Sequence, residues 1–424
     1  MLNQFKNFNI YFLIFVSFIF SLAVFYLYLK QSVANDSTIS EYLINYQGGF
    51  TRRGLIGEIS FQIASFLDLS LRFTIFLIQS TIYFIFLSLT YFFIKNLPNN
   101  ILSIIAIFSP VFLLYPIAEI EVLVRKEIFL FVAFIIFLNI SNIKFSKNIP
   151  LIYIFLIFPI VILIWEPSIF FFPFIAFIIL INNNNDSFTK ILIKIILSFS
   201  SSIFVSLYII FNLLSHDGHE LMKISLLNNF GETCYMSCAL LGSKSTIQSQ
   251  FDAVNHLFTF TIFFRYFLII FISFLPLFIL FYNSKIKEKN SFFDNSNNLL
   301  IVLLILLIPV LILFSSATDW GRWVNISYTF SIFLYLYLFK NKLILINNKI
   351  LFFDNFYRNR KKIFIILFII FAFCWNPKTS MRGDVATNSL YKIIYNTSKR
   401  VFKFNGVRLF QDSTIMKLHQ KYIE

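Results

Sequence analysis

Residues 10 to 29 read "IYFLIFVSFIFSLAVFYLYL", a run without one charged side chain. An α-helix needs roughly 20 mainly apolar residues to cross the hydrocarbon core of a bilayer, and this run has that length. It is longer than the apolar part of a secretory signal, and Lys30 separates it from the small residues Ser32, Val33 and Ala34. We therefore expect a first membrane span that is not cleaved.

Similar apolar runs recur along the whole chain of 424 residues, of which 58% are hydrophobic and only 13% are charged. Runs of this length favour one integrated membrane domain over the separate soluble domains usual for such a chain. We predict an all-α fold, a polytopic membrane helical bundle of about 11 transmembrane helices. The expected spans are residues 10–29, 71–94, 101–117, 128–142, 150–165, 168–182, 189–214, 257–282, 298–315, 323–340 and 363–376.

The formal net charge of +15 comes mainly from lysines and arginines in the short connectors between the apolar runs. Basic connectors of this kind stay on the cytoplasmic side, so the charge indicates membrane orientation and not a nucleic-acid partner. With an internal N-terminus, the alternation of spans places Lys95, Lys144, Lys190 and the basic cluster at 340–362 inside. We predict a multi-pass membrane protein with a cytoplasmic N-terminus and an external active face.

Residues 1–376 form the expected transmembrane domain, and residues 377–424 form a basic C-terminal tail. The span count places this tail outside, whereas a last apolar run that does not cross would leave the tail on the inner surface. Gly54 to Leu69 is too polar to span and is typical of an amphipathic helix at the outer interface. The expected external segments are residues 30–70, 118–127, 215–256 and 315–322.

Three basic sites lie in these external segments, where the positive-inside rule disfavours them. Arginine binds phosphate through two parallel hydrogen bonds and keeps its charge, and the glycines of "GGFTRRG" (48–54) let backbone amides approach an anion closely. The structural alternative is that the arginines pair with external carboxylates or lipid head groups. As diphosphate contacts we predict Arg52, Arg53, Arg125 (beside Lys126) and Arg322.

Two further external segments combine acids with bases. In "EIEVLVRKE" (119–127), Glu121 and Arg125 have the i,i+4 spacing of a helical ion pair. In "TDWGRW" (318–323), Asp319 and Arg322 are three residues apart and either pair with each other or act on a ligand. Trp320 and Trp323 in the same segment are interface anchors or stacking surfaces for a sugar.

The longest external segment, residues 215–256, is expected to be a loop and begins with "SHDGHE" (215–220). His216 beside Asp217 offers a general base and its orienting carboxylate, the alternative being a solvated start of the loop. Cys234 and Cys238 form with His216 and His219 a set of zinc-ligand types. We favour a disulfide over zinc because an external compartment oxidises such cysteines, and we expect neither a metal nor a cofactor.

The sequence contains no Walker-type phosphate loop, GxSxG, HExxH or dinucleotide-binding motif. An external face that carries "GGFTRRG", "TDWGRW" and "SHDGHE" on a multispanning chain resembles the bacterial O-antigen and capsular polysaccharide polymerases (Wzy-type). More broadly it resembles the GT-C class of multispanning glycosyltransferases. The resemblance implies polymerisation of polyprenyl-diphosphate-linked repeat units at the external or periplasmic face of the bacterial cytoplasmic (inner) membrane. It implies as partners that lipid-linked glycan, membrane lipid and a chain-length regulator protein.

The resemblance also implies roles for the residues. In the polymerases a large periplasmic loop carries catalytic residues, which here are His216 and Asp217, and arginines contact the diphosphate. In GT-C transferases that use polyprenyl-phosphate sugars the key acid lies in the first external loop, so Asp36, Glu41 or Glu58 would serve. The catalytic residues that we predict are His216, Asp217, Asp319 and Glu41, with Trp320 and Trp323 stacking on sugar.

Two other functions remain open. One is a branching transferase of the GT-C class with a polyprenyl-phosphate sugar as donor. The other is a flippase or transporter for lipid-linked oligosaccharides, although transporters usually carry charged or broken helices near the bilayer midplane. Convergence of residues 30–70, 215–256 and 315–322 on one groove would favour the enzyme.

Overall fold

The computed structural model describes residues 2–95, 97, 100–142, 148–183, 186–242, 247–287, 299–346, 356–357, 359–383 and 385–387. Helices dominate this part of the chain, as expected for an all-α membrane protein, and only four short strands accompany them. The strands form two antiparallel pairs. β1 (Ser284–Ile286) pairs with β2 (Ile344–Ile346), and β3 (Trp375–Asn376) pairs with β4 (Ala386–Thr387).

The helices follow one another along the chain with short connections. The first half contains α1 (Leu2–Lys30), α2 (Ser37–Tyr42), α3 (Leu55–Leu67), α4 (Leu71–Ile94), α5 (Ile101–Ile107), α6 (Tyr115–Ala118), η1 (Ile120–Val122), α7 (Glu127–Ile140), α8 (Ile149–Ile164), η2 (Glu166–Phe171), α9 (Phe172–Asn182) and α10 (Phe188–Phe211). The second half contains α11 (His216–Phe230), η3 (Ala239–Gly242), α12 (Ile247–Leu257), α13 (Phe260–Tyr282), α14 (Leu299–Leu307), η4 (Ile308–Val310), α15 (Leu311–Ser316), α16 (Trp320–Lys340) and α18 (Lys361–Phe373).

Five helices of the described chain are long and apolar enough to cross a membrane. They are Phe8–Lys30, Leu71–Ile94, Phe188–Phe211, Phe260–Tyr282 and Leu299–Ser316, the last of which combines α14, η4 and α15. The apolar helices Leu55–Leu67, Glu127–Ile140, Ile149–Ile164 and Glu166–Asn182 are shorter. The predicted membrane-embedded helical fold is therefore supported, whereas the expected number of about 11 spans is not confirmed.

Helix α16 forms the centre of the bundle. Every residue from Trp320 to Leu338 is buried, and the ring of Phe330 stacks on those of Phe134 and Phe171 at 4.3 and 4.8 Å between centroids. Outer helices such as α1 and α10 instead expose large apolar side chains, for example Tyr11 and Phe204. A helix buried on all sides within a ring of outward-apolar helices is the pattern of a membrane bundle.

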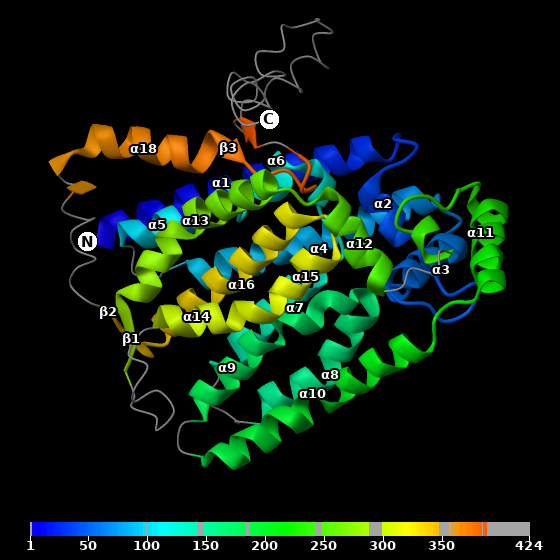
Figure 1. The fold of residues 1–424 in the computed structure, drawn as a ribbon. Helices are drawn as coiled ribbons and strands as arrows, with labels where there is room; N and C mark the ends of the chain where they lie inside the picture. Colours follow the sequence, from blue (N-terminus) through cyan, green and yellow to red (C-terminus); the bar gives the residue numbers. More distant parts are fainter. Residues whose placement is uncertain are drawn as a thin grey trace, which may run out of the picture.

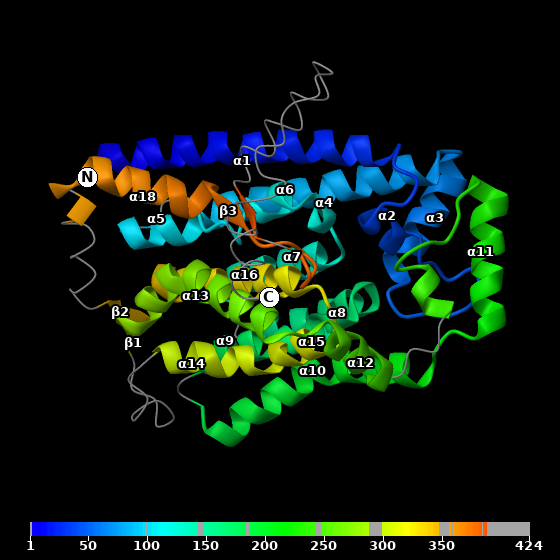
Figure 2. The ribbon, with the colours of Figure 1, turned by 45° about the horizontal axis from the view of Figure 1, so that its top comes forward.

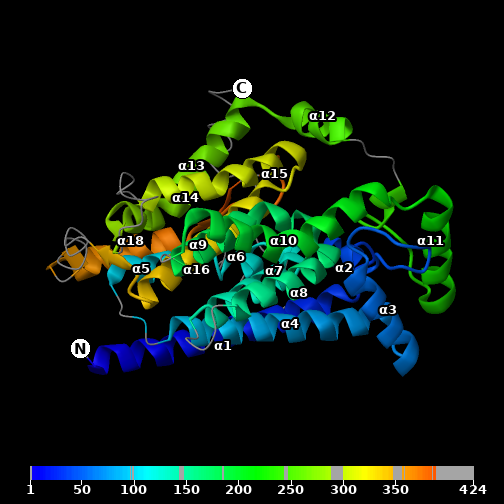
Figure 3. The same ribbon diagram turned by 90° about the horizontal axis from the view of Figure 1, so that it is seen from below.

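The predicted inner and outer segments lie at opposite ends of the bundle. The β1–β2 pair, which continues into the basic connectors, is at the left in Figures 1 and 2, whereas α2, α3 and α11 are at the right. In Figure 3, seen from below, α2, α3 and α11 again lie together at one end. We call the end with α2, α3 and α11 the outer end.

Helix α3 confirms the helix expected over Gly54 to Leu69. Its inner face packs so closely that an added Cβ at Gly57 would lie 1.8 Å from the carbonyl oxygen of Ile44. Its other face exposes apolar side chains, among them Ile59 and Phe66. An exposed apolar face at the end of a membrane bundle fits a helix in the interface.

Three sequence-based expectations were wrong in detail. The span expected at 101–117 is broken after α5, because Pro110 cannot continue a helix, and the chain turns before α6. The span expected at 168–182 begins in the 3-10 helix η2, and only α9 is regular. The external segment 215–256 is largely helical, since it contains α11 and most of α12.

The chain after α18 returns to the start of α16. We call residues 377–383 the strap. The backbone N–H of Gly321 donates to the carbonyl of Thr379 at 3.1 Å, and that of Met381 donates to the carbonyl of Thr318 at 2.8 Å. The strap therefore lies beside Thr318 and Gly321, at the same end of the bundle as the start of α16. Residues 388–424, the rest of the predicted tail, lie outside the described residues.

Candidate functional site

An ion-pair network lies at the outer end, and five separate parts of the chain supply it. We call it the outer ion network. Its members are Glu41 of α2, Arg52 and Arg53 of the following loop, Arg125, Lys126 and Glu127 at the start of α7, Glu166 of η2, and Asp319 and Arg322 around the start of α16. All four sequence-predicted diphosphate ligands belong to it, together with Glu41 and Asp319.

Arg322 occupies the buried centre of the network. Its Nε donates to Oε1 of Glu127 at 2.8 Å, and its Nη2 donates to the other carboxylate oxygen. Its Nη1 lies 3.3 Å from Oε1 of Glu41. The guanidinium also lies over the rings of Trp165 and Trp323, at 5.6 and 5.5 Å from their centroids. Such a guanidinium is held rigidly by hydrogen bonds and by cation–π contacts.

Arg125 connects this buried centre to the surface. Its Nε lies 3.3 Å from Oε1 of Glu41, and its Nη1 donates to Oδ2 of Asp319 at 3.1 Å. Asp319 also lies 3.5 Å from Nη1 of Arg322, as the three-residue spacing allowed. The side chain of Asp319 is 32% exposed, whereas those of Glu41 and Arg322 are 2% and 3% exposed. Asp319 is therefore the carboxylate through which this part of the network meets the outside.

Arg52, Arg53 and Glu166 form a second half-exposed part. The Nε of Arg53 donates to both carboxylate oxygens of Glu166, at 2.8 and 2.7 Å. Arg52 is 4.0 Å from the same carboxylate, the longest ion pair of the network, and its side chain is 29% exposed. Its guanidinium is the most loosely held, so it is the member best able to accept an external anion.

Lys126 joins the two parts. Its fully buried ammonium donates to the carbonyl of Arg53 and lies 5.8 Å from the ring centroid of Tyr42. Its backbone N–H donates to Oε2 of Glu41 at 3.4 Å. Lys126 therefore ties the loop that carries Arg52 and Arg53 to the buried carboxylate.

The backbone beside the network is strained. Arg53 and Val124 adopt positive φ angles of 62° and 53°. This left-handed conformation is unfavourable for residues other than glycine and rare for a β-branched residue. Such conformations persist where the surrounding contacts impose them, and they cluster at functional sites.

The buried charges also shift one another's protonation. Burial alone would raise the pKa of the Glu41 carboxyl, but the positive charges of Arg322 and Arg125 outweigh burial and lower this pKa to about 2. Burial lowers the pKa of the Lys126 ammonium to about 7, although the Glu41 carboxylate opposes the shift. At neutral pH Glu41 is therefore an ionised anchor for the surrounding cations.

His216 and Asp217 lie outside this network. They begin α11, with side chains 74% and 100% exposed and 4.0 Å between Nδ1 and the nearer carboxylate oxygen. The neighbouring His219 is buried, and its Nε2 lies 3.1 Å from the carbonyl oxygen of Cys238. Cys234 and Cys238 form the disulfide that we favoured, so their sulfurs are not thiolates for zinc.

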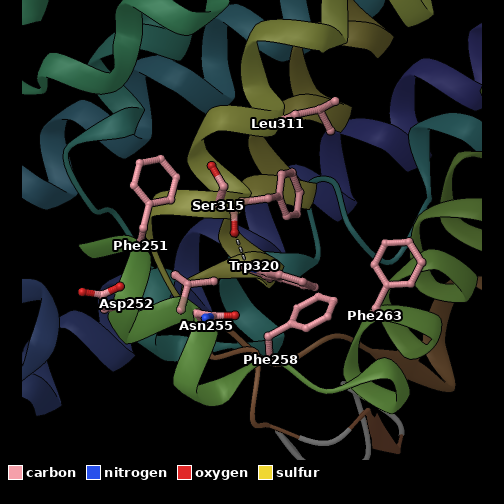
Figure 4. Close-up of a pocket in the computed structure, with 10 residues that line it drawn as sticks. Phe251, Asp252, Asn255, Phe258, Phe263, Leu311, Ser315 and Trp320 are labelled. Atoms are coloured by element: carbon pink, nitrogen blue, oxygen red, sulfur yellow. Dashed lines mark hydrogen bonds between the residues drawn. The ribbon is translucent and has the colours of Figure 1, made fainter. Parts of the chain in front are cut away.

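The two predicted stacking residues are enclosed. Trp323 is 4% exposed and stacks on Trp165 at 6.2 Å between centroids. Trp320 is 6% exposed, and its Nε1 donates to the carbonyl of Phe314 at 2.8 Å. One side of Trp320 contributes to the wall of a cavity of about 560 Å³, which lies beside α12, α13 and α15 (Figure 4).

Sequence reasoning missed two residues that hold Arg322 and misassigned one pair. Glu127 and Trp165 hold Arg322. The sequence feature that could have indicated them is the position of each, an acid and an indole, at the edge of an apolar run. The expected pair of Glu121 with Arg125 does not form, because η1 ends at Val122 and the left-handed Val124 breaks the helical spacing. Glu121 is exposed, and Arg125 pairs with Glu41 and Asp319.

Comparisons with known proteins add no relative: no family model, no curated protein and no solved structure matches this chain.

Proposed function

We propose that this protein transfers glycosyl groups from a polyprenyl-diphosphate-linked oligosaccharide on the outer face of the cytoplasmic membrane, and so polymerises repeat units of a surface polysaccharide. The observation that carries the proposal is the outer ion network, which joins half-exposed arginines and a half-exposed carboxylate at one end of an apolar helical bundle. A lipid-linked anion needs cations at the end of the bundle where it binds. The acceptor sugar needs a proton acceptor beside those cations.

Arg52 and Arg53 are the proposed diphosphate ligands. Their side chains are 29% and 27% exposed, and they follow the glycine pair of "GGFTRRG". In glycosyl transfer the bond between the anomeric carbon and the diphosphate oxygen breaks, and the diphosphate leaves with the bonding electrons. Their guanidinium charges stabilise the negative charge on that leaving group, and Arg53 is already held by Glu166 before the ligand binds.

Asp319 is the proposed general base. It accepts the proton of the acceptor hydroxyl while the hydroxyl oxygen forms the new bond to the anomeric carbon. Its carboxylate is held by Arg125 at 3.1 Å and is accessible from outside. Arg125, Arg322, Glu41 and Glu127 are positioning residues in this assignment, because they are buried and bind one another. His216 and Asp217 have no role in this scheme.

A second candidate is a branching transferase of the GT-C class. The observation that favours it is Glu41, since the first external segment brings this acid between Arg125 and Arg322. The segment also forms α2 and α3 between the first two long helices. In this alternative the donor carries one phosphate, and the product is a side-chain sugar on a polymer of unchanged length.

Gene deletion followed by gel analysis of the surface glycan separates the candidates. A polymerase deletion leaves one repeat unit on the lipid core, a branching deletion leaves a full but shifted ladder, and a flippase deletion leaves no lipid-linked glycan outside. Complementation with Asp319→Asn, or with Arg52→Ala combined with Arg53→Ala, should not restore the ladder. The cells should keep the phenotype of a polymerase deletion, one repeat unit on the lipid core.

Loss of such charge-stabilising groups lowers rates by roughly 100- to 1,000-fold. Lys223→Ala, in an exposed pair with Glu220, is the matched control and should restore the ladder. Membrane immunoblots verify equal expression. Normal ladders with both site variants would contradict the proposal, and loss of the ladder in His216→Ala would return the base to α11.

A further inference from the structure

We propose that the cavity between α12, α13, α15 and the start of α16 binds a sugar ring of the acceptor glycan. The inference rests on the proposed function and names a substrate site for it. The cavity measures about 560 Å³, within the range of roughly 300–1,000 Å³ typical of small-molecule sites.

The wall of the cavity combines two kinds of surface. Aromatic rings of Phe251, Phe258, Phe263, Phe314 and Trp320 make up much of it, as Figure 4 shows in part. The polar contribution comes from Asp252, Asn255 and Ser315. A sugar ring has the same two aspects, an apolar C–H face and a rim of hydroxyl groups, so aromatic faces and a few polar groups suit it together.

The same wall disfavours the other parts of a lipid-linked glycan. Among the ten described residues that line the cavity there is no lysine or arginine, and Asp252 adds negative charge, so a diphosphate finds no cation here. An isoprenoid chain would cover the polar side chain of Asn255 without offering a hydrogen bond, at a cost in free energy. The diphosphate and the sugar are thus assigned to different surfaces of the outer end.

Trp320 connects the cavity to the outer ion network. It directly follows Asp319, and its ring is held by those of Tyr266 and Phe314, at 5.2 and 5.7 Å between centroids, and by the hydrogen bond from Nε1 to Phe314. The wall of the cavity and the proposed base therefore belong to one rigid turn. Trp320, which lines the cavity, thus directly follows the proposed base along the chain, while the carboxylate of Asp319 is held by Arg125 and Arg322.

Direct binding to the purified full chain in lipid nanodiscs tests the inference. The two probes are the free oligosaccharide released by mild acid from the lipid-linked glycan of deletion cells, and polyprenyl phosphate without sugar. Saturation-transfer NMR and titration measure the affinity for each. We expect the combined variant Asp252→Asn, Asn255→Ala to weaken oligosaccharide binding at least 10-fold, which corresponds to about 1.4 kcal/mol, and to leave polyprenyl-phosphate binding unchanged.

His256→Ala, an exposed change on the same helix but outside the cavity wall, is the matched control and should bind both probes normally. Equal thermal unfolding midpoints show that the variants fold. If the combined variant binds the oligosaccharide as the wild type does, the inference is overturned and the proposed function stands. The same holds if the wild type binds polyprenyl phosphate but not the oligosaccharide. Loss of polyprenyl-phosphate binding in the combined variant assigns the cavity to the lipid instead. If the wild-type protein binds neither probe and deletion of its gene leaves the ladder unchanged, both the inference and the proposed function are overturned.

Discussion

At the scale of single residues, burial separates the arginines into two groups with different consequences. Arg322 is 3% exposed and is held by Glu127 and Glu41, whereas Arg52 and Arg53 remain 29% and 27% exposed. A buried charge is tolerated only with its partner, because its hydration has been lost. We therefore assign Arg322 to the architecture of the outer end, and Arg52 and Arg53 to contact with a ligand.

Glu127→Gln should destabilise the protein strongly. The change removes the charge opposite the buried Arg322, and breaking a buried ion pair costs roughly 3–5 kcal/mol. The measurement is the unfolding midpoint of the purified protein in detergent during titration with SDS or urea. Glu220→Gln, which removes the same charge from the exposed pair with Lys223 at 2.8 Å, is the control and should leave the midpoint unchanged. A wild-type midpoint for Glu127→Gln would mean that Glu41 alone sustains Arg322.

At the scale of elements, the strap positions the start of α16. The hydroxyl of Tyr266 donates to the carbonyls of Lys378 and Ser380 at 3.0 and 3.1 Å, and the ammonium of Lys378 lies 3.0 Å from Glu119. These contacts join α13, the segment before α7 and the strap around the turn that contains Asp319. The close approach requires glycine, because a Cβ at Gly321 would lie 2.0 Å from the carbonyl oxygen of Lys378.

Gly321→Ala should displace the strap from α16, because the new methyl group meets backbone atoms that cannot move alone. We expect faster proteinase K cleavage within residues 377–383, read by mass spectrometry, together with reduced activity from a misplaced Asp319. Arg382→Ala alters an exposed side chain of the same segment and serves as the control. Unchanged cleavage in Gly321→Ala would show that the strap does not depend on this contact.

At the scale of the whole molecule, the two ends of the bundle differ in chemistry. The end with β1 and β2 continues into lysine-rich connectors, whereas the opposite end carries the outer ion network, the disulfide and the aromatic cavity. Positive connectors orient a membrane protein with that end in the cytoplasm. A disulfide is also stable in an oxidising external compartment.

Cysteine labelling should confirm this orientation. In a Cys374→Ala background, a membrane-impermeant maleimide should label Asp217→Cys in intact cells, and Lys285→Cys only after lysis, since both side chains are exposed at opposite ends. The background protein without an added cysteine gives the reference signal, because Cys234 and Cys238 are bonded to each other. Labelling of Lys285→Cys in intact cells would reverse the topology and place the proposed site inside.

The amino-acid sequence by itself determined the long apolar helices, the amphipathic helix α3 and the segments between apolar runs in which the polar residues gather. These features follow from local hydropathy, because the backbone of a chain in a bilayer must satisfy its own hydrogen bonds segment by segment. Only the tertiary structure decided which charges meet. Arg322 pairs with Glu127 and Glu41 across 195 and 281 residues of sequence, and His216 remains exposed although its local motif resembled a catalytic pair. Ion pairing depends on which turns reach the same end of the bundle and on how deeply each is buried, and no local pattern contains that information.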